Sequence, residues 1–293
     1  MELATRALFV ALVVVVAITA VGTSVFLLSI RPHRYTTAST PATAFGWSYE
    51  DITLRTTDNV LLAAWFIPKK NEAASRTAVI VLHGYPYSKG NVLGLTPYLH
   101  EDYDLLLPDF RYFGDSEGSF TTLGHREWRD VAAAVAFLKD RGYTSVGVWG
   151  FSLGASVALL TLPHVGGIDA VVADSAYSDL HEMTLDYYGR LPVLAGSLAR
   201  VTDLLTIVCF GFAPVDLSPA RAAARVQTPL LLIHGEADRT IPMHHHERVR
   251  EALSAHPSVQ SWVVAGADHG YTYSAATATY EERVLEFLAR HLQ

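Results

Sequence analysis

The sequence predicts an α/β protein in which a mostly parallel sheet is covered by helices on both faces. Apolar, β-branched runs alternate along the chain with segments of helical periodicity, the pattern of parallel strands that are buried on both sides. Near the middle of the chain, Gly150-Phe151-Ser152-Leu153-Gly154 joins one such run to a helical segment. This pentapeptide is predicted to form a tight strand-to-helix turn.

An uncharged apolar segment, Ala7–Ile30, opens the chain and is 24 residues long. About 20 apolar residues cross a bilayer as a helix, whereas the apolar core of a signal peptide has roughly 7–15. We therefore predict a single-pass anchor in the cell membrane within residues 1–34, in contact with lipid through residues 7–30. A cleaved signal peptide is the alternative. The basic residues on the two flanks nearly balance, so they assign no orientation.

A linker at residues 35–46 and one catalytic domain at residues 47–293 complete the predicted organisation. The domain begins with a hairpin of Glu50–Arg55 and Val60–Phe66. The strands predicted after it are Ala78–Leu82, Leu105–Leu107, Val146–Trp149, Ala170–Ala173, Leu230–Ile233 and Trp262–Val264. The predicted helices are Asn91–His100, Arg126–Arg141, Leu153–Leu162, His245–Ala255 and Tyr280–His291. Residues 177–224 are too long for an ordinary connection between strands and are predicted to form a lid over the catalytic edge.

Composition excludes several classes of protein. The net charge of −7 and the lack of Lys/Arg runs argue against a nucleic-acid partner. The single cysteine, Cys209, excludes an internal disulfide and a cysteine-based metal site. The motifs of the common nucleotide and zinc sites are absent from the sequence, so no cofactor and no metal are expected.

Ser152 is the predicted nucleophile. A serine between two glycines at a strand-to-helix turn matches the nucleophile elbow, in which bulky residues two positions either side of the serine would collide. A hydroxyl needs an adjacent base that a third group orients. Asp238 and His269 each follow a predicted strand, in the chain order Ser, acid, His. We predict that His269 is the general base and Asp238 the acid, with Glu236 as an alternative acid.

Two backbone N–H groups are expected to form the oxyanion hole. One belongs to Leu153, directly after the nucleophile, and the other to Tyr85, in the loop after Ala78–Leu82. Tyr85 and Tyr87 are candidates for the substrate pocket, and covering the sheet edge is the equal alternative for both. His83 is expected to be structural.

Other polar residues are interpreted as structural. Asp174 follows a strand and is expected to fix a loop by hydrogen bonding. Asp109 and Arg111 are expected to pair with each other or to cap a turn. His244-His245-His246 is expected to lie at a solvated helix start.

With these residues in place, the chain resembles the α/β-hydrolase superfamily, and more narrowly the membrane-anchored serine hydrolases of the BEM46-like and ABHD type, near the serine aminopeptidase-like branch. The resemblance covers roughly residues 47–293. It implies an eight-stranded, mostly parallel sheet, the triad Ser152, Asp238 and His269, the oxyanion donors Tyr85 and Leu153, and no cofactor. Its carriers are His83-Gly84-Tyr85, residues 109–118, the pentapeptide at 150–154, residues 228–242 and Asp268-His269. Tyr112 departs from the pattern, because relatives usually have glycine there.

The sequence therefore predicts a membrane-tethered serine hydrolase that acts on carboxylic esters through an acyl-enzyme. The apolar anchor and lid favour lipophilic acyl esters or thioesters as substrates. A serine peptidase or amidase of the same fold is the first alternative. A non-catalytic binding protein of this fold is the second, and the intact set of three candidate residues argues against it.

Overall fold

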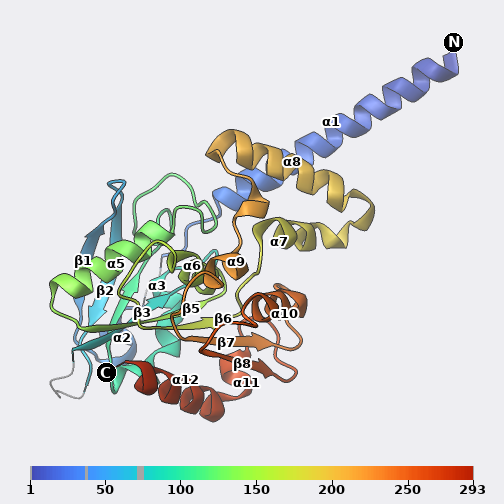
Figure 1. Ribbon diagram of the computed structural model, residues 1–293. Helices are drawn as coiled ribbons and strands as arrows, with labels where there is room; N and C mark the ends of the chain where they lie inside the picture. Colours follow the sequence, from blue (N-terminus) through green and yellow to red (C-terminus); the bar gives the residue numbers. More distant parts are fainter. Residues whose placement is uncertain (1, 37–38, 71–75, 293) are drawn as a thin grey trace. The chain divides into compact units, whose positions relative to one another are not determined.

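The computed structural model describes residues 2–36, 39–70 and 76–292, and the chain divides into two compact units (Figure 1). One unit, called the catalytic unit below, contains His33–Ser178 and Ser218–Gln293. The other, the helical unit, contains Met1–Pro32 and Asp179–Leu217. Each unit is described by itself.

An eight-stranded sheet forms the centre of the catalytic unit, with the strand order β1-β2-β4-β3-β5-β6-β7-β8. β1 pairs antiparallel with β2, and β2 antiparallel with β4, whereas all later pairs are parallel. The predicted α/β-hydrolase fold with a mostly parallel sheet is confirmed. The strands are β1 (Glu50–Arg55), β2 (Leu61–Ile67), β3 (Thr77–Leu82), β4 (Asp104–Pro108), β5 (Ser145–Phe151), β6 (Ala170–Asp174), β7 (Leu230–Gly235) and β8 (Val259–Val264).

Helices cover both faces of this sheet, because the inner parallel strands are apolar along their whole length and need burial on either side. On one face lie α3 (Lys89–Val92), η1 (Leu93–Leu95), α4 (Pro97–His100) and α12 (Thr277–His291), whose apolar side chains join a single cluster with those of the strands. Towards the other face, α5 (Trp128–Asp140), α6 (Leu153–Thr161), α9 (Pro219–Ala223) and α10 (Met243–Ala252) pack against one another. The remaining helices of the unit are α2 (Pro41–Phe45) and α11 (Thr272–Ala275).

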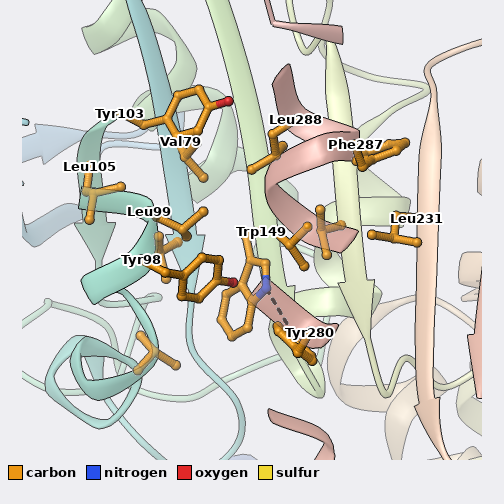
Figure 2. Close-up of a cluster of buried hydrophobic side chains, with 14 of the residues drawn as sticks. Val79, Tyr98, Leu99, Tyr103, Leu105, Trp149, Leu231, Tyr280, Phe287 and Leu288 are labelled. Atoms are coloured by element: carbon orange, nitrogen blue, oxygen red, sulfur yellow. Dashed lines mark hydrogen bonds between the residues drawn. The ribbon is translucent and has the colours of Figure 1, made fainter. Parts of the chain in front are cut away.

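Trp149 of β5 and Tyr280 of α12 are the central pair of the core between the sheet and α12 (Figure 2). Both side chains are fully buried, and the Trp149 indole N–H donates to the Tyr280 hydroxyl at 3.1 Å. The Tyr280 hydroxyl in turn donates to Asp174 at the end of β6, at 2.9 Å. Buried aromatic rings of this size dominate core energetics when their polar atoms are satisfied. The core of the sheet is thereby connected to the strand ends where the candidate site lies.

Two local predictions were wrong. The helix predicted over residues 91–100 is three short pieces, α3, η1 and α4, because Pro97 has no N–H to continue a helix. The predicted linker contains α2, which is capped by the Thr40 side chain at its start and ends at Gly46, a residue in the left-handed conformation. Residues 37–38 of the predicted linker lie outside the described residues.

The helical unit consists of α1 (Glu2–Ile30), α7 (Leu180–Tyr187), η2 (Tyr188–Arg190), α8 (Pro192–Phe210) and η3 (Pro214–Asp216). α1 packs against α8, with Tyr188, Leu198 and Ala199 buried between these elements. α1 is apolar and long enough to cross a membrane or to serve as a signal sequence, and α8 meets the same criteria of length and composition.

Candidate active site

Ser152 lies in a sharp turn between β5 and α6. Its backbone has φ +56° and ψ −114°, a strained conformation for a residue with a side chain. The two flanking glycines make this turn possible. A Cβ on Gly150 would lie 2.5 Å from the backbone of Gly154, and one on Gly154 would lie 2.5 Å from the Leu82 carbonyl oxygen. The backbone N–H of Ser152 donates to the Asp174 carbonyl oxygen at 2.8 Å, which fixes the turn to β6.

The structure brings the three predicted side chains Ser152, His269 and Asp238 into one hydrogen-bonded line. The Ser152 hydroxyl and His269 Nε2 are 3.0 Å apart, and His269 Nδ1 lies 2.7 Å from Asp238 Oδ2. They come from the ends of β5, β8 and β7, which are close in space because parallel strands bring their carboxyl ends to one edge of the sheet. With a carboxylate at Nδ1, that nitrogen carries the proton, so the Nε2 lone pair faces the serine.

Asp238 is held by the backbone of its own loop. Its side chain is fully buried, and Oδ1 accepts the backbone N–H groups of Thr240 at 2.9 Å and Ile241 at 2.8 Å. Oδ2 is left for His269. The alternative acid, Glu236, is exposed and accepts instead from the backbone N–H of Gly266 at 2.9 Å. The geometry therefore favours Asp238 over Glu236 as the partner of the imidazole.

Sequence reasoning missed an ion pair that joins the loop of Asp238 to the loop of His269. The guanidinium of Arg239, directly after Asp238, pairs with the carboxylate of Asp268, directly before His269. Asp268 also accepts the backbone N–H groups of Arg239 at 3.0 Å and His269 at 2.9 Å. The hydrogen bonds from Arg239 hold the pKa of Asp268 well below its usual range. A basic and an acidic residue adjacent to the two candidates were the available signal in the sequence.

Asp174, at the end of β6, holds the loop that carries His269 in place. Its buried carboxyl accepts the hydroxyls of Thr272 at 2.6 Å and Tyr280 at 2.9 Å. Thr272 follows His269 closely in the chain, so this contact fixes the histidine loop, as the sequence led us to expect. Burial raises the pKa of the Asp174 carboxyl, although the hydroxyl hydrogen bonds act in the opposite direction.

The loop after β3 passes beside Ser152. A Cβ on Gly84 would come within 3.2 Å of the Ser152 Cβ, tighter than an ordinary contact, so glycine eases the close approach of the loop. Tyr85, the predicted oxyanion donor and pocket residue, is half-buried, with its ring edge-on to Phe113. Leu153 is the first residue of α6, where the N–H groups of a helix have no partner within it. Tyr87 is exposed and faces the Tyr35 ring.

His83 is structural, as expected. Its ring is buried, Nδ1 lies 2.8 Å from the Gly84 carbonyl oxygen, and Nε2 accepts the Phe110 backbone N–H at 3.0 Å. Burial lowers the pKa of this imidazole. Tyr112 adopts φ +72°, a conformation that favours glycine, the residue that the resemblance implies at this position.

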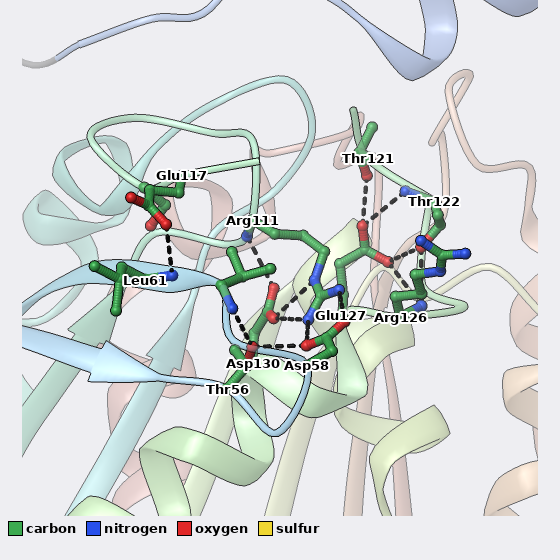
Figure 3. Close-up of polar contacts among 12 residues, drawn as sticks. Thr56, Asp58, Leu61, Arg111, Glu117, Thr121, Thr122, Arg126, Glu127 and Asp130 are labelled. Atoms are coloured by element: carbon green, nitrogen blue, oxygen red, sulfur yellow. Dashed lines mark hydrogen bonds and ion pairs between the residues drawn. The ribbon is translucent and has the colours of Figure 1, made fainter. Parts of the chain in front are cut away.

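Asp109 and Arg111 do not pair with each other. The alternative role, capping a turn, holds for Asp109, whose carboxylate accepts the backbone N–H groups of Lys89 at 2.7 Å and Asp115 at 2.9 Å. Asp109 pairs with the buried ammonium group of Lys89 at 2.6 Å. Arg111 pairs instead with Asp130 and Asp58, both at 2.7 Å (Figure 3). Both residues are buried, so each needs an opposite charge of its own.

The expected solvation of the three consecutive histidines was also wrong for two of them. His245 and His246 are buried at the start of α10. His245 Nδ1 lies 2.8 Å from the Ser178 hydroxyl, and His246 Nε2 lies 2.8 Å from the Ser261 hydroxyl.

Comparison with known proteins is consistent with this architecture. Residues 77–206 match the alpha/beta hydrolase fold family, and residues 211–293 match the prolyl oligopeptidase family. The chain is 29% identical to the uncharacterized protein YqkD of Bacillus subtilis over 225 residues, which cover 72% of this chain and 70% of YqkD. It is 31% identical to the human protein ABHD12B over 159 residues, 51% of this chain and 41% of that protein. Its structure is similar to that of the Pyrococcus furiosus esterase Pf2001, with a TM-score of 0.73 and 30% identity over 90% of this chain and 99% of the esterase.

Proposed function

Because the chain belongs to the α/β-hydrolase superfamily, we propose that it is a serine hydrolase that cleaves carboxylic esters through an acyl-enzyme. The observation that carries the proposal is the hydrogen-bonded line from Asp238 through His269 to Ser152. Similarity to an esterase that the chain covers almost completely supports ester substrates.

In the proposed reaction, His269 Nε2 takes the proton of the Ser152 hydroxyl as the serine oxygen attacks the acyl carbon. Asp238 keeps the imidazole in the required tautomer and stabilises the imidazolium that forms. The protonated imidazole then gives its proton to the departing alcohol, which leaves the acyl group on Ser152. A water molecule, activated by the same histidine, attacks the acyl carbon and releases the acid and the free serine.

The negative charge of each tetrahedral intermediate falls on the former carbonyl oxygen. We propose that the backbone N–H groups of Tyr85 and Leu153 stabilise it, each contributing about 10²–10³-fold in rate. The close approach of Gly84 to Ser152 supports this assignment, because it brings the loop that carries Tyr85 alongside the nucleophile. Tyr85 and Tyr87 then border the substrate.

The helical unit suggests where the enzyme works and on what. We propose that α1 anchors the chain in a membrane, since its side chains before Ile18 are exposed and largely apolar. An enzyme held at a bilayer meets lipophilic esters at high local concentration, so acyl esters or thioesters with apolar chains are the proposed substrates.

A serine peptidase is the second candidate. The observation that favours it is the match of residues 211–293, which include Asp238 and His269, to the prolyl oligopeptidase family. The same three side chains serve either reaction, because both pass through an acyl-enzyme. Matched amide and ester substrates, compared after correction for their intrinsic reactivity, distinguish the two candidates.

The test is hydrolysis of p-nitrophenyl esters of increasing acyl length by the full chain in detergent, with Ser152→Ala in parallel. We expect activity that increases with acyl length to an optimum. We expect the variant to lose about 10⁴-fold or more in kcat while unfolding at the same temperature. Ester hydrolysis by Ser152→Ala at the wild-type rate would overturn the proposal. Activity confined to the matched amides would move the assignment to peptidase.

A further inference from the structure

The helical unit carries an apolar surface on α8, which we call the outer face of α8. Val193 is 92% exposed and Val208 72% exposed. Burying such side chains is worth about 25 cal/mol for each Å² removed from water, and contiguous exposed apolar surface marks a contact with a partner or a membrane. The large apolar side chains of this face are Val193, Leu194, Leu204, Ile207 and Val208, and Tyr187 and Leu191 lie exposed just before α8.

Three polar side chains of α8 point the other way, into the helical unit. The Thr202 hydroxyl lies 2.9 Å from the Tyr188 hydroxyl. Asp203 is 2.7 Å from the His181 imidazole. Thr206 is buried and donates to the Thr202 carbonyl oxygen. These three polar side chains of α8 therefore face the helical unit, whereas large apolar side chains are presented outward.

Helix α12 of the catalytic unit shows the usual arrangement in the same chain. It buries Tyr280, Val284, Phe287 and Leu288 and exposes charged side chains such as Glu282, Glu286 and Arg290. A helix that faces water has this pattern. α8 also buries apolar residues, Leu198 and Ala199, but exposes large apolar side chains in place of charged ones, which indicates an apolar surrounding for its outer face.

The contacts of α1 identify that surrounding. The C-terminal part of α1 packs on α8, where Gly22 makes room for Val201 and the rings of Phe26 and Phe210 lie 5.8 Å apart. The N-terminal part of α1 is apolar and exposed. At about 1.5 Å per residue, the 29 residues of α1 extend roughly 43 Å, more than the ~30 Å of a hydrocarbon core. The part of α1 that pairs with α8 thus falls at the bilayer boundary.

We propose that α8 docks into the lipid bilayer beside α1, with its outer face among the acyl chains. This inference rests on the anchoring role proposed above for α1. Exposed apolar side chains lie both on α8 and on α1, the helix that packs against it, which favours lipid over a protein partner as the occupant. α8 has only two charged residues: Asp203 faces His181, and Arg200 is exposed. A single cation on such a face reaches anionic headgroups by snorkelling.

The chain supplies its own probe for a test. Its single cysteine, Cys209, is exposed on α8. The full chain is labelled there with a polarity-sensitive fluorophore and reconstituted into vesicles of phosphatidylcholine and phosphatidylglycerol. We expect blue-shifted emission, quenching by doxyl-labelled lipids and a several-fold smaller quenching constant for aqueous iodide than in a control. The control is Cys209→Ser with Ser254→Cys, which moves the label to an exposed residue of the catalytic unit.

A variant with Leu204→Asp and Val208→Asp separates docking from anchoring. We expect it to float with vesicles through α1 and to cleave a soluble short-chain ester at the wild-type rate, while the label at Cys209 becomes several-fold more accessible to iodide. Hydrolysis of a long-chain ester dissolved in the vesicles is expected to fall.

Three results would overturn the proposal. In the first, the chain binds vesicles, but iodide quenches the label at Cys209 as strongly as it quenches the control label at position 254. In the second, the label is shielded from both iodide and doxyl lipids and the chain is dimeric, which assigns the outer face to a second copy. In the third, the chain fails to float, which removes anchor and docking together. Esterase activity is measured separately in detergent, so a failure of the enzyme assignment is distinguishable from all three.

Discussion

The catalytic unit contains two buried polar networks, one around Arg111 and one through His269, and they differ in the groups that they connect. The network around Arg111 is closed, because its guanidinium meets the carboxylates of Asp130 and Asp58 (Figure 3). The line through His269 is open at one end. It begins at a buried carboxylate and ends at a neutral hydroxyl, and the His269 side chain keeps 17% of its exposure.

The closed network holds loops together. Arg111 in the loop after β4 connects the turn between β1 and β2, through Asp58, to α5, through Asp130. Nearby, the buried carboxylate of Glu127 accepts the backbone N–H groups of Thr122 and Gly124, both at 2.8 Å. Burial and pairing of carboxylates are common to the two networks, and the Arg111 network also reaches a hydroxyl, that of Thr56, which donates to Asp58 at 2.6 Å. What distinguishes the line through His269 is an imidazole placed between a buried carboxylate and a hydroxyl.

The largest effect is expected at the acid of the open line. Asp238→Asn keeps an oxygen for its loop but no longer fixes the tautomer of His269, so we expect kcat for a p-nitrophenyl ester to fall about 10⁴-fold with little change in thermal unfolding. Glu236→Gln is the matched control and is expected to change kcat by less than about threefold. A greater loss from Glu236→Gln than from Asp238→Asn would exchange the roles of the two carboxylates.

The next effect is expected in the closed network, and on stability. Arg111→Met leaves Asp130 buried without its counter-charge, which costs about 3–5 kcal/mol in the free energy of unfolding. Urea unfolding measures this loss, and kcat per folded molecule should stay within a few-fold of wild type. Lys70→Met is the control. It breaks the exposed Lys70–Glu101 pair and is expected to cost about 1 kcal/mol or less. Equal losses in the two variants would mean that the buried Arg111 network contributes no more to stability than the exposed Lys70–Glu101 pair.

The sequence was informative where short-range rules apply. The sharp turn at Ser152 is predictable because it depends on two glycines within five residues. The strand ends are predictable because the apolar runs end there. The chain order then placed Asp238 and His269 after the correct strands, and their catalytic roles stay predictions. The pairing of buried charges was not predictable, because the partners of Arg111 lie on distant elements whose approach only the folded chain determines. The burial of His245 and the outward apolar face of α8 have the same origin, since both depend on neighbours far along the chain.

The smallest effect concerns pH and has opposite signs at two carboxyls, Asp174 and Asp58. Burial raises the pKa of Asp174, which supports the open line. A raised carboxyl pKa costs stability only where the group is ionised, so the cost is absent below about pH 4 and grows as pH rises towards the folded-state pKa. We therefore expect Asp174→Asn to gain stability relative to wild type over that rise, by about 1.4 kcal/mol for each unit by which the pKa is raised.

Asp58 supplies the matched control for this pH series, because hydrogen bonds from Arg111 hold its pKa well below the usual range. Its contribution to stability is fully present above the unfolded-state pKa of about 4 and is lost as pH falls through the folded-state value. Asp58→Asn should therefore be destabilised near neutral pH and approach wild type in acid. Urea unfolding of both variants and wild type across this range measures the two slopes. If the stability of both variants relative to wild type changed in the same direction with pH, the opposite pKa shifts assigned to Asp174 and Asp58 would be contradicted.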